Sequence, residues 1–183
     1  MSKILVIILG TAVILTLSKR SLLRPTVHGF YRFFAFEAIL FLIVMNSAFW
    51  GFGMGGWMEI LARLFLITSL VLAICSFYFL IKRGKPVAAT SPNATTLGFE
   101  NTTQLVTTDV YRWIRHPMYA SLLYLAWGSG LKNLSLWSVG LMLVVTIALI
   151  ATAKVEEKEN LTRFGEAYRQ YMSRTRRFIP FVY

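Results

Sequence analysis

The chain has 183 residues, of which 56% are hydrophobic and 15% charged, and carries a formal net charge of +11, with a mean hydropathy of +0.60. This composition is too apolar for a water-soluble domain and is typical of a helical protein that crosses a membrane several times. Because the positive charges lie beside apolar runs, their expected partner is an anionic lipid surface, and no nucleic-acid partner is expected.

Apolar runs in the first half predict three membrane spans, over about residues 4–17, 30–50 and 59–81. The first run is short for a bilayer core of about 30 Å, but flanking lysines can extend to reach water. Glycines between 51 and 56 predict a turn before the third span. Glu37 is an ionisable residue inside the second span. Such a group either pairs with a buried partner or faces a cavity that receives a substrate.

The second half begins with a polar segment, residues 84–109, which is expected to be a loop. Pro117 suits the first position of a fourth helix, which is expected to run to about residue 131. After a tight turn, a fifth span over about 135–153 is expected to continue as a polar, amphipathic helix through about 173. The sequence therefore predicts an all-α membrane protein with five transmembrane helices and a C-terminal cytosolic amphipathic helix.

We expect a single membrane domain over residues 1–183, in which 1–83 form three spans and 84–183 form a loop, a helical hairpin and the terminal helix. Lysine and arginine are concentrated in the connections on one side of the predicted spans. The positive-inside rule then places the N-terminus outside and the C-terminus in the cytosol. The expected location of this multi-pass protein is a bacterial inner membrane.

One polar cluster lies where the fourth helix begins. Arg115 and His116 precede Pro117, and Tyr111 and Tyr119 flank them. The first turn of a helix leaves backbone N–H groups unpaired and carries partial positive charge, so this end suits an anionic group such as a carboxylate or phosphate. The alternative interpretation is a basic helix end that only anchors the protein to lipid headgroups.

A second polar cluster, Glu156 and Glu157, follows the fifth span. The short hairpin of the fourth and fifth helices is expected to return Glu156 to the level of His116. A ligand that bridges both clusters needs a negative end and a positive or hydroxyl-bearing end. S-adenosylmethionine fits this description, and so do other zwitterions. The alternative is a solvated helix face without a ligand.

Two stretches carry a resemblance to a known family: LVTTDVYRWIRHPMY at 105–119, and Glu156-Glu157 followed by FGEAYRQY at 164–171 and by Pro180. They resemble the isoprenylcysteine carboxyl methyltransferase and phospholipid methyltransferase superfamily over residues 97–183. The resemblance implies an integral-membrane enzyme that moves a methyl group from S-adenosylmethionine to a lipid or lipid-soluble acceptor at the cytosolic face. No metal is expected.

The resemblance also implies the residues of the site. The implied cofactor-binding residues are Gln104, Leu105, Val106, Tyr111, His116, Pro117, Met118, Tyr119 and Glu156. Arg115 and Glu157 are the candidate catalytic residues. Isoprenylcysteine enzymes carry an arginine one turn before the glutamate, where this chain has Thr152 with Lys154 nearby. This departure counts against a prenylcysteine substrate and leaves an amine-bearing phospholipid or another small lipid-soluble acceptor as alternatives. Thr152 and Lys154 are therefore candidate substrate residues, and Glu37 in the second span is a third.

Two other functions compete with this prediction. One is an NADPH-dependent membrane reductase with a related C-terminal half, although the chain is short for that class. The other is a non-enzymatic lipid-binding membrane protein. Binding of NADPH would identify the first, and the absence of any soluble-ligand site would identify the second.

Overall fold

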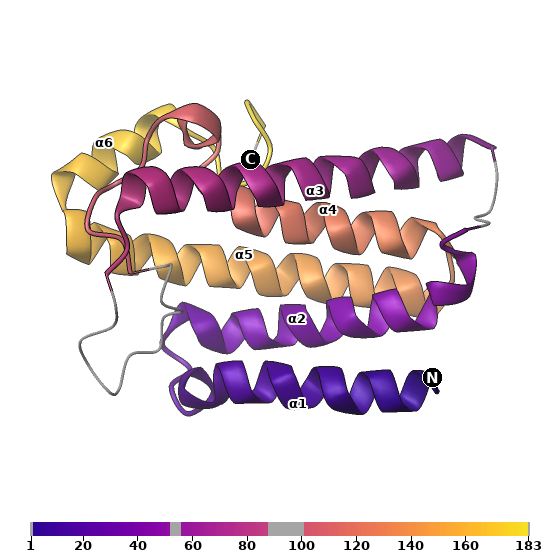
Figure 1. Cartoon of the computed structure of the whole chain (residues 1–183). Coiled ribbons are helices and arrows are strands. Elements are labelled where there is room, and N and C mark those ends of the chain that lie inside the picture. The colour runs from indigo at the N-terminus through magenta and orange to yellow at the C-terminus, as the bar shows by residue number, and fades with distance from the viewer. Residues whose placement is uncertain (1, 52–55, 88–100, 183) are drawn as a thin grey trace.

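The computed structural model describes residues 2–51, 56–87 and 101–182 and confirms the predicted all-helical fold. The described residues contain six α-helices and two short 3-10 turns, and no strand. Helices α1 to α5 run back and forth beside one another, and α6 lies at one end of this bundle (Figure 1). In chain order the elements are α1 (Lys3–Leu22), α2 (His28–Met45), η1 (Ser47–Phe49), α3 (Gly56–Gly84), η3 (Asp109–Arg112), α4 (Pro117–Leu131), α5 (Leu136–Phe164) and α6 (Glu166–Arg174).

Small side chains allow the central helices to pack closely. Helix α4 packs on α3 and on α5, while α2 packs on α5 and α1. Ala35 and Ala120 are fully buried in the shared core, as is Ala126. At Gly128 in α4, an added Cβ would lie 3.0 Å from the carbonyl oxygen of Ala62 in α3, so only glycine permits this approach. The close packing places the starts of α2 and α4 beside the ends of α3 and α5.

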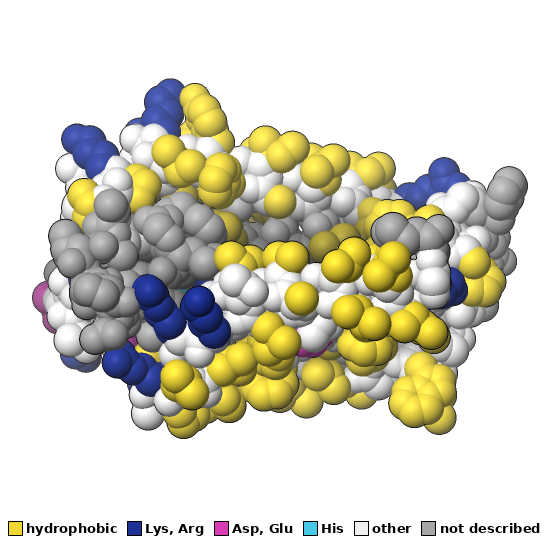
Figure 2. Space-filling view, turned by 60° about the horizontal axis from the view of Figure 1, so that its bottom comes forward, with side chains coloured by type: hydrophobic (Ala, Val, Ile, Leu, Met, Phe, Trp, Pro, Cys, Tyr) yellow, Lys and Arg dark blue, Asp and Glu magenta, His cyan; other side chains and the backbone are white. Residues whose placement is uncertain are grey.

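Four helices, α1, α2, α3 and α5, are long and apolar enough to cross a membrane. Hydrophobic side chains cover the middle of the face shown in Figure 2, and lysine and arginine lie toward its ends. Helix α4 has 15 residues, which corresponds to about 22 Å at 1.5 Å per residue. The fifth span therefore stays a prediction, and so does the orientation in the membrane.

The first two helices differ from their predicted bounds. Helix α1 extends to Leu22 rather than ending near Leu17. Helix α2 ends at Met45 rather than near Trp50, because the buried Asn46 side chain donates hydrogen bonds to Ser129 O (3.0 Å) and Ser138 Oγ (3.2 Å). Of the predicted glycine turn and polar loop, residues 52–55 and 88–100 lie outside the described residues.

The prediction of one continuous helix from α5 through residue 173 is wrong. Gly165 adopts φ +57° and ψ −132°, which ends α5 at Phe164, and α6 begins at Glu166. This backbone conformation is accessible to glycine and strained for other residues. The sequence pattern stays polar and helical across the break, so only the glycine marks it. As a result, α6 leaves α5 at an angle (Figure 1), and the C-terminal segment 166–182 packs against the start of α4.

We expect Gly165→Ala to lower the free energy of unfolding by about 1–2 kcal/mol, because the strain falls on the backbone. A Cβ at Gly165 would meet no atom within 4 Å, so crowding does not contribute. Gly140 in α5 is the matched control, since a Cβ there also meets nothing within 4 Å. Its φ is helical, so Gly140→Ala is expected to be neutral or stabilising by up to about 1 kcal/mol. Thermal unfolding of the purified protein in detergent measures both, and equal changes would contradict the assignment of strain to Gly165.

Candidate functional site

The C-terminal segment is hydrogen-bonded to the backbone that leads into α4. Arg115 N donates to Arg176 O (2.7 Å), His116 N donates to Arg177 O (3.1 Å), and Arg176 N donates to Trp113 O (3.2 Å). These bonds form a short parallel pairing between residues 113–116 and 176–177. The backbone before Pro117 is therefore held by residues about 60 positions later in the chain, and His116 is fixed at the N-cap of α4.

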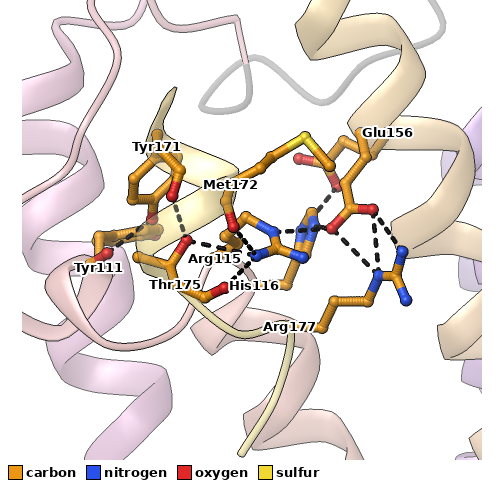
Figure 3. A network of polar contacts seen from close by, with 9 residues as sticks. Tyr111, Arg115, His116, Glu156, Tyr171, Met172, Thr175 and Arg177 are labelled. Atoms are coloured by element: carbon orange, nitrogen blue, oxygen red, sulfur yellow. Dashed lines mark hydrogen bonds and ion pairs between the residues drawn. The ribbon is translucent and has the colours of Figure 1, made fainter. Parts of the chain in front are cut away.

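Glu157 pairs with Arg115 and Arg177 in a largely buried ionic network. Figure 3 labels the two arginines. Arg115 Nε donates to Glu157 Oε1 at 2.8 Å, and Arg177 Nη2 donates to Glu157 Oε2 at 2.8 Å. The side chains of Arg115 and Glu157 are only 8% and 5% exposed. Arg115 Nη1 also donates to the carbonyl oxygens of Met172 (3.1 Å) and Thr175. The network therefore ties α5, the start of α4 and the C-terminal segment together.

Beside this network lies a cavity, which we call the site cavity, with about 690 Å³ of empty space including its open mouth. Its walls come from the end of α3, the loop before η3, the start of α4, the polar end of α5, and α6. The lining residues are Leu80, Thr102, Leu105, Val106, Tyr111, Arg115, His116, Pro117, Met118, Tyr119, Glu156, Asn160, Phe164, Tyr168 and Tyr171.

Two buried polar atoms on the wall of the site cavity, His116 Nε2 and Glu156 Oε2, have no hydrogen-bond partner among the described residues. The shortest approach of His116 Nε2 to a carboxylate is 3.5 Å, to Glu157 Oε1, and His116 Nδ1 lies 3.7 Å from Glu156 Oε2. Buried polar groups in proteins are nearly always hydrogen-bonded, so two such atoms at one cavity indicate a polar ligand or ordered water there. The His116 ring is stacked on Tyr119, with centroids 5.5 Å apart, which holds its orientation.

Tyrosines form another part of the wall. Tyr111 Oη donates to Ser76 O (3.2 Å), and Tyr171 Oη donates to Tyr111 O (2.7 Å). Burial, with a smaller contribution from the Glu156 carboxylate, raises the pKa of Tyr111. Burial likewise raises the pKa of Tyr171. Both phenols therefore stay neutral hydrogen-bond donors at physiological pH, and they fix η3 against α3 and α6.

The structure brings together nearly all the residues that the resemblance implied for cofactor binding. All of them except Gln104 line the site cavity, and Gln104 lines a neighbouring depression with Lys82 and Arg83. Of the two catalytic candidates, Arg115 lines the site cavity, whereas Glu157 lies behind it with both oxygens bonded to arginines. In this geometry Glu157 holds Arg115 and Arg177 in place and does not face the site cavity.

The three candidate substrate residues do not line the site cavity. Glu37 accepts a hydrogen bond from Thr11 Oγ1 (2.9 Å) and so faces α1. Thr152 is fully buried, and its hydroxyl donates to Ala148 O within the same helix (2.7 Å). Lys154 is exposed. The polar residues near the end of α5 point in different directions because successive positions of a helix are about 100° apart.

Asn160, Phe164 and Tyr168 line the site cavity and were absent from the sequence-based set. Asn160 follows Glu156 by four positions, and this spacing on a helix places two side chains on one face. That signal could have identified Asn160. Arg177 had no comparable signal, because its contact with Glu157 depends on the turn at Gly165 and the return of the chain.

Comparison with protein families identifies the family of this chain. Residues 57–167 match the phospholipid methyltransferase family. Because the match covers more than half of the chain, the chain belongs to this family. The matched region includes the site-cavity wall from Leu80 to Phe164, and Tyr168 and Tyr171 follow it.

This family member is also similar to a curated protein, the methanethiol S-methyltransferase of Mycobacterium tuberculosis (strain ATCC 25618 / H37Rv). The two are 26% identical over 135 residues, which are 73% of this chain and 48% of the relative. The chain therefore spans about half the length of that relative.

Proposed function

We propose that this protein transfers a methyl group from S-adenosylmethionine to a lipid-soluble acceptor at the cytosolic face of a membrane. The observation that carries the proposal is the pair of buried polar atoms, His116 Nε2 and Glu156 Oε2, which converge on the site cavity without hydrogen-bond partners among the described residues. Membership of the phospholipid methyltransferase family supports the same reaction class.

The residues of the site cavity fit the polar groups of this cofactor. The Glu156 carboxylate suits an ammonium or a ribose hydroxyl, because Oε2 is buried and accepts no hydrogen bond from any described residue. The first turn of α4, after Pro117, presents backbone N–H groups and a partial positive charge that suit a carboxylate. Leu105, Val106 and the aromatic walls supply apolar surface for an adenine ring. The cavity thus offers complementary groups for both ends and for the apolar part of the ligand.

When bound, S-adenosylmethionine supplies a methyl group activated by its sulfonium centre. The contribution of the protein is to orient this group and to exclude water, since direct displacement at a methyl group depends mainly on alignment. The stacked ring of His116 and the neutral phenol of Tyr111 are held by neighbouring groups and so define fixed walls. His116 Nε2 can hydrogen-bond the cofactor or the acceptor at this position.

The acceptor is proposed to enter from the bilayer. Leu80, near the end of the long apolar helix α3, forms one wall of the site cavity. The outward side chains of α3, including Ile74, Phe77 and Ile81, are 61%, 45% and 42% exposed, as expected for a lipid-facing surface. A lipid-soluble amine or thiol arriving along α3 would therefore reach the site cavity without crossing bulk water.

Ligand binding by the full-length protein in detergent tests this proposal. Saturating S-adenosylhomocysteine, the expected product, should raise the midpoint of thermal unfolding by several degrees, because a ligand that binds only the folded state stabilises it. NADPH should produce no shift. His116→Ala should abolish the shift, whereas the exposed Lys158→Ala on the same end of α5 should preserve it. No shift for the wild-type protein, or a shift with NADPH alone, would contradict the proposal.

A further inference from the structure

A second and larger hollow lies along the C-terminal segment, with about 1670 Å³ of empty space including its open mouth. We call it the arginine groove. One wall is the end of η3, with Arg112 and the following Trp113, and the other is the C-terminal segment, with Arg174, Arg176 and Phe181. Among the described residues, only Leu105 and Tyr171 line both the arginine groove and the site cavity. The groove is therefore a separate feature that the proposed methyl transfer does not use.

The groove carries three exposed guanidinium groups, those of Arg112, Arg174 and Arg176. No ion pair to a carboxylate is formed by these three within the described part of the chain, and none of the groove's lining residues is acidic. By contrast, the adjacent Arg115 and Arg177 are both engaged by Glu157. Three arginines held around one hollow repel one another, so an anion in the groove would relieve an unfavourable charge arrangement.

Large apolar side chains border the same groove. The rings of Trp113 and Phe181 lie 5.5 Å apart, and these side chains are 48% and 78% exposed. Val182, next in the chain, is 72% exposed. The guanidinium of Arg112 lies over the Trp113 ring, 5.3 Å from its centroid. Exposed tryptophan, phenylalanine and arginine side by side are typical of surfaces that sit at the boundary between lipid headgroups and acyl chains.

We propose that the arginine groove binds the phosphate of an anionic membrane phospholipid, while Trp113, Phe181 and Val182 rest against the adjoining acyl chains. Arginine suits phosphate because its planar guanidinium can donate two parallel hydrogen bonds. A soluble phosphate would satisfy the arginines but would leave the apolar border in water. A phospholipid satisfies both parts, and the apolar helices α1, α2, α3 and α5 place the protein among such lipids.

This site has a consequence for the rest of the molecule. The groove wall includes Thr175, whose carbonyl oxygen and hydroxyl both accept hydrogen bonds from Arg115. A lipid bound in the groove therefore stabilises the C-terminal segment in the position where it contacts the ionic network and borders the site cavity. The inference concerns lipid binding alone and does not depend on the identity of the cofactor.

The test is a titration of the full-length protein in non-ionic detergent with short-chain, soluble dihexanoyl phosphatidylglycerol, read as the midpoint of thermal unfolding. Parallel titrations use dihexanoyl phosphatidylcholine, which is zwitterionic, and inorganic phosphate. We expect a saturable rise with phosphatidylglycerol only. The triple variant Arg112→Gln, Arg174→Gln, Arg176→Gln should require roughly a hundredfold more lipid, because each basic residue near an anionic surface contributes about fivefold. Arg174→Gln alone should give a smaller change in the same direction.

The matched control removes three exposed basic residues from the connection between α1 and α2: Lys19→Gln, Arg20→Gln and Arg24→Gln. This control should respond to phosphatidylglycerol as the wild-type protein does. The proposal is overturned if the control loses the response equally, since the effect would then be general charge attraction. It is also overturned if phosphate or phosphatidylcholine acts as strongly as phosphatidylglycerol. If the triple variant does not fold, the wild-type titrations and Arg174→Gln still decide the outcome.

Discussion

Glu157→Ala is expected to destabilise the protein by roughly 3–5 kcal/mol, the usual cost of leaving a buried charge without its partner. Glu157 is 5% exposed and neutralises two arginines, of which Arg115 is itself 8% exposed. Removing the carboxylate leaves the Arg115 guanidinium buried, and its remaining acceptors among the described residues are the carbonyl and hydroxyl oxygens of Met172 and Thr175. The midpoint of thermal unfolding in detergent should therefore fall much further for Glu157→Ala than for a substitution at the surface.

The same substitution should also release the C-terminal segment, because Arg177 loses its contact with α5. Limited trypsin digestion is expected to cut Glu157→Ala after Arg174 or Arg176 faster than it cuts the wild-type protein. Glu166→Ala is the control. Glu166 pairs with Arg169 at 3.2 Å, and the two side chains are 68% and 73% exposed, so its loss should change stability by no more than about 0.5 kcal/mol. Equal effects of the two substitutions would show that the ionic network does not hold the segment.

Glu156→Gln is expected to have the opposite profile: a large loss of ligand affinity with little change in stability. Glu156 Oε2 has no hydrogen-bond partner among the described residues, so the fold gains little from its charge. A hydrogen bond to a charged group is worth about 1.5–3 kcal/mol, which corresponds to roughly 10- to 150-fold in affinity. We expect S-adenosylhomocysteine to bind Glu156→Gln more weakly by this factor, measured by isothermal titration calorimetry.

Stability provides the control for this prediction. The unfolding midpoint of Glu156→Gln without ligand should stay close to that of the wild-type protein, and Glu166→Gln should alter neither stability nor affinity because that side chain is 68% exposed. If Glu156→Gln binds the ligand as tightly as the wild-type protein, Glu156 has no role in the site cavity. If it unfolds as easily as Glu157→Ala, its role is structural. The comparison separates two adjacent glutamates that composition and spacing alone treat alike.

Much of the fold was predictable because it depends on local patterns. Pro117 placed the start of α4 correctly, since proline suits the first helical position. The expectation that the hairpin of α4 and α5 returns Glu156 to the level of His116 is confirmed, since His116 Nδ1 lies 3.7 Å from Glu156 Oε2. The continuous helix through residue 173 was wrong because one glycine with a positive φ outweighs a favourable helical pattern.

The sequence by itself determined the class of protein, the helical hairpin and most residues of the site-cavity wall around the start of α4, because apolar periodicity, helix-start signals and the spacing of short motifs are local properties. Only the tertiary structure decided the separate positions of Glu156 and Glu157, the pairing of Arg177, and the placement of Glu37, Thr152 and Lys154 away from the cavity. These depend on the direction of each side chain around its helix and on contacts between residues far apart in the sequence, such as Arg115 and Thr175, which are 60 positions apart. Such contacts are set by packing of the whole chain, which no short motif encodes.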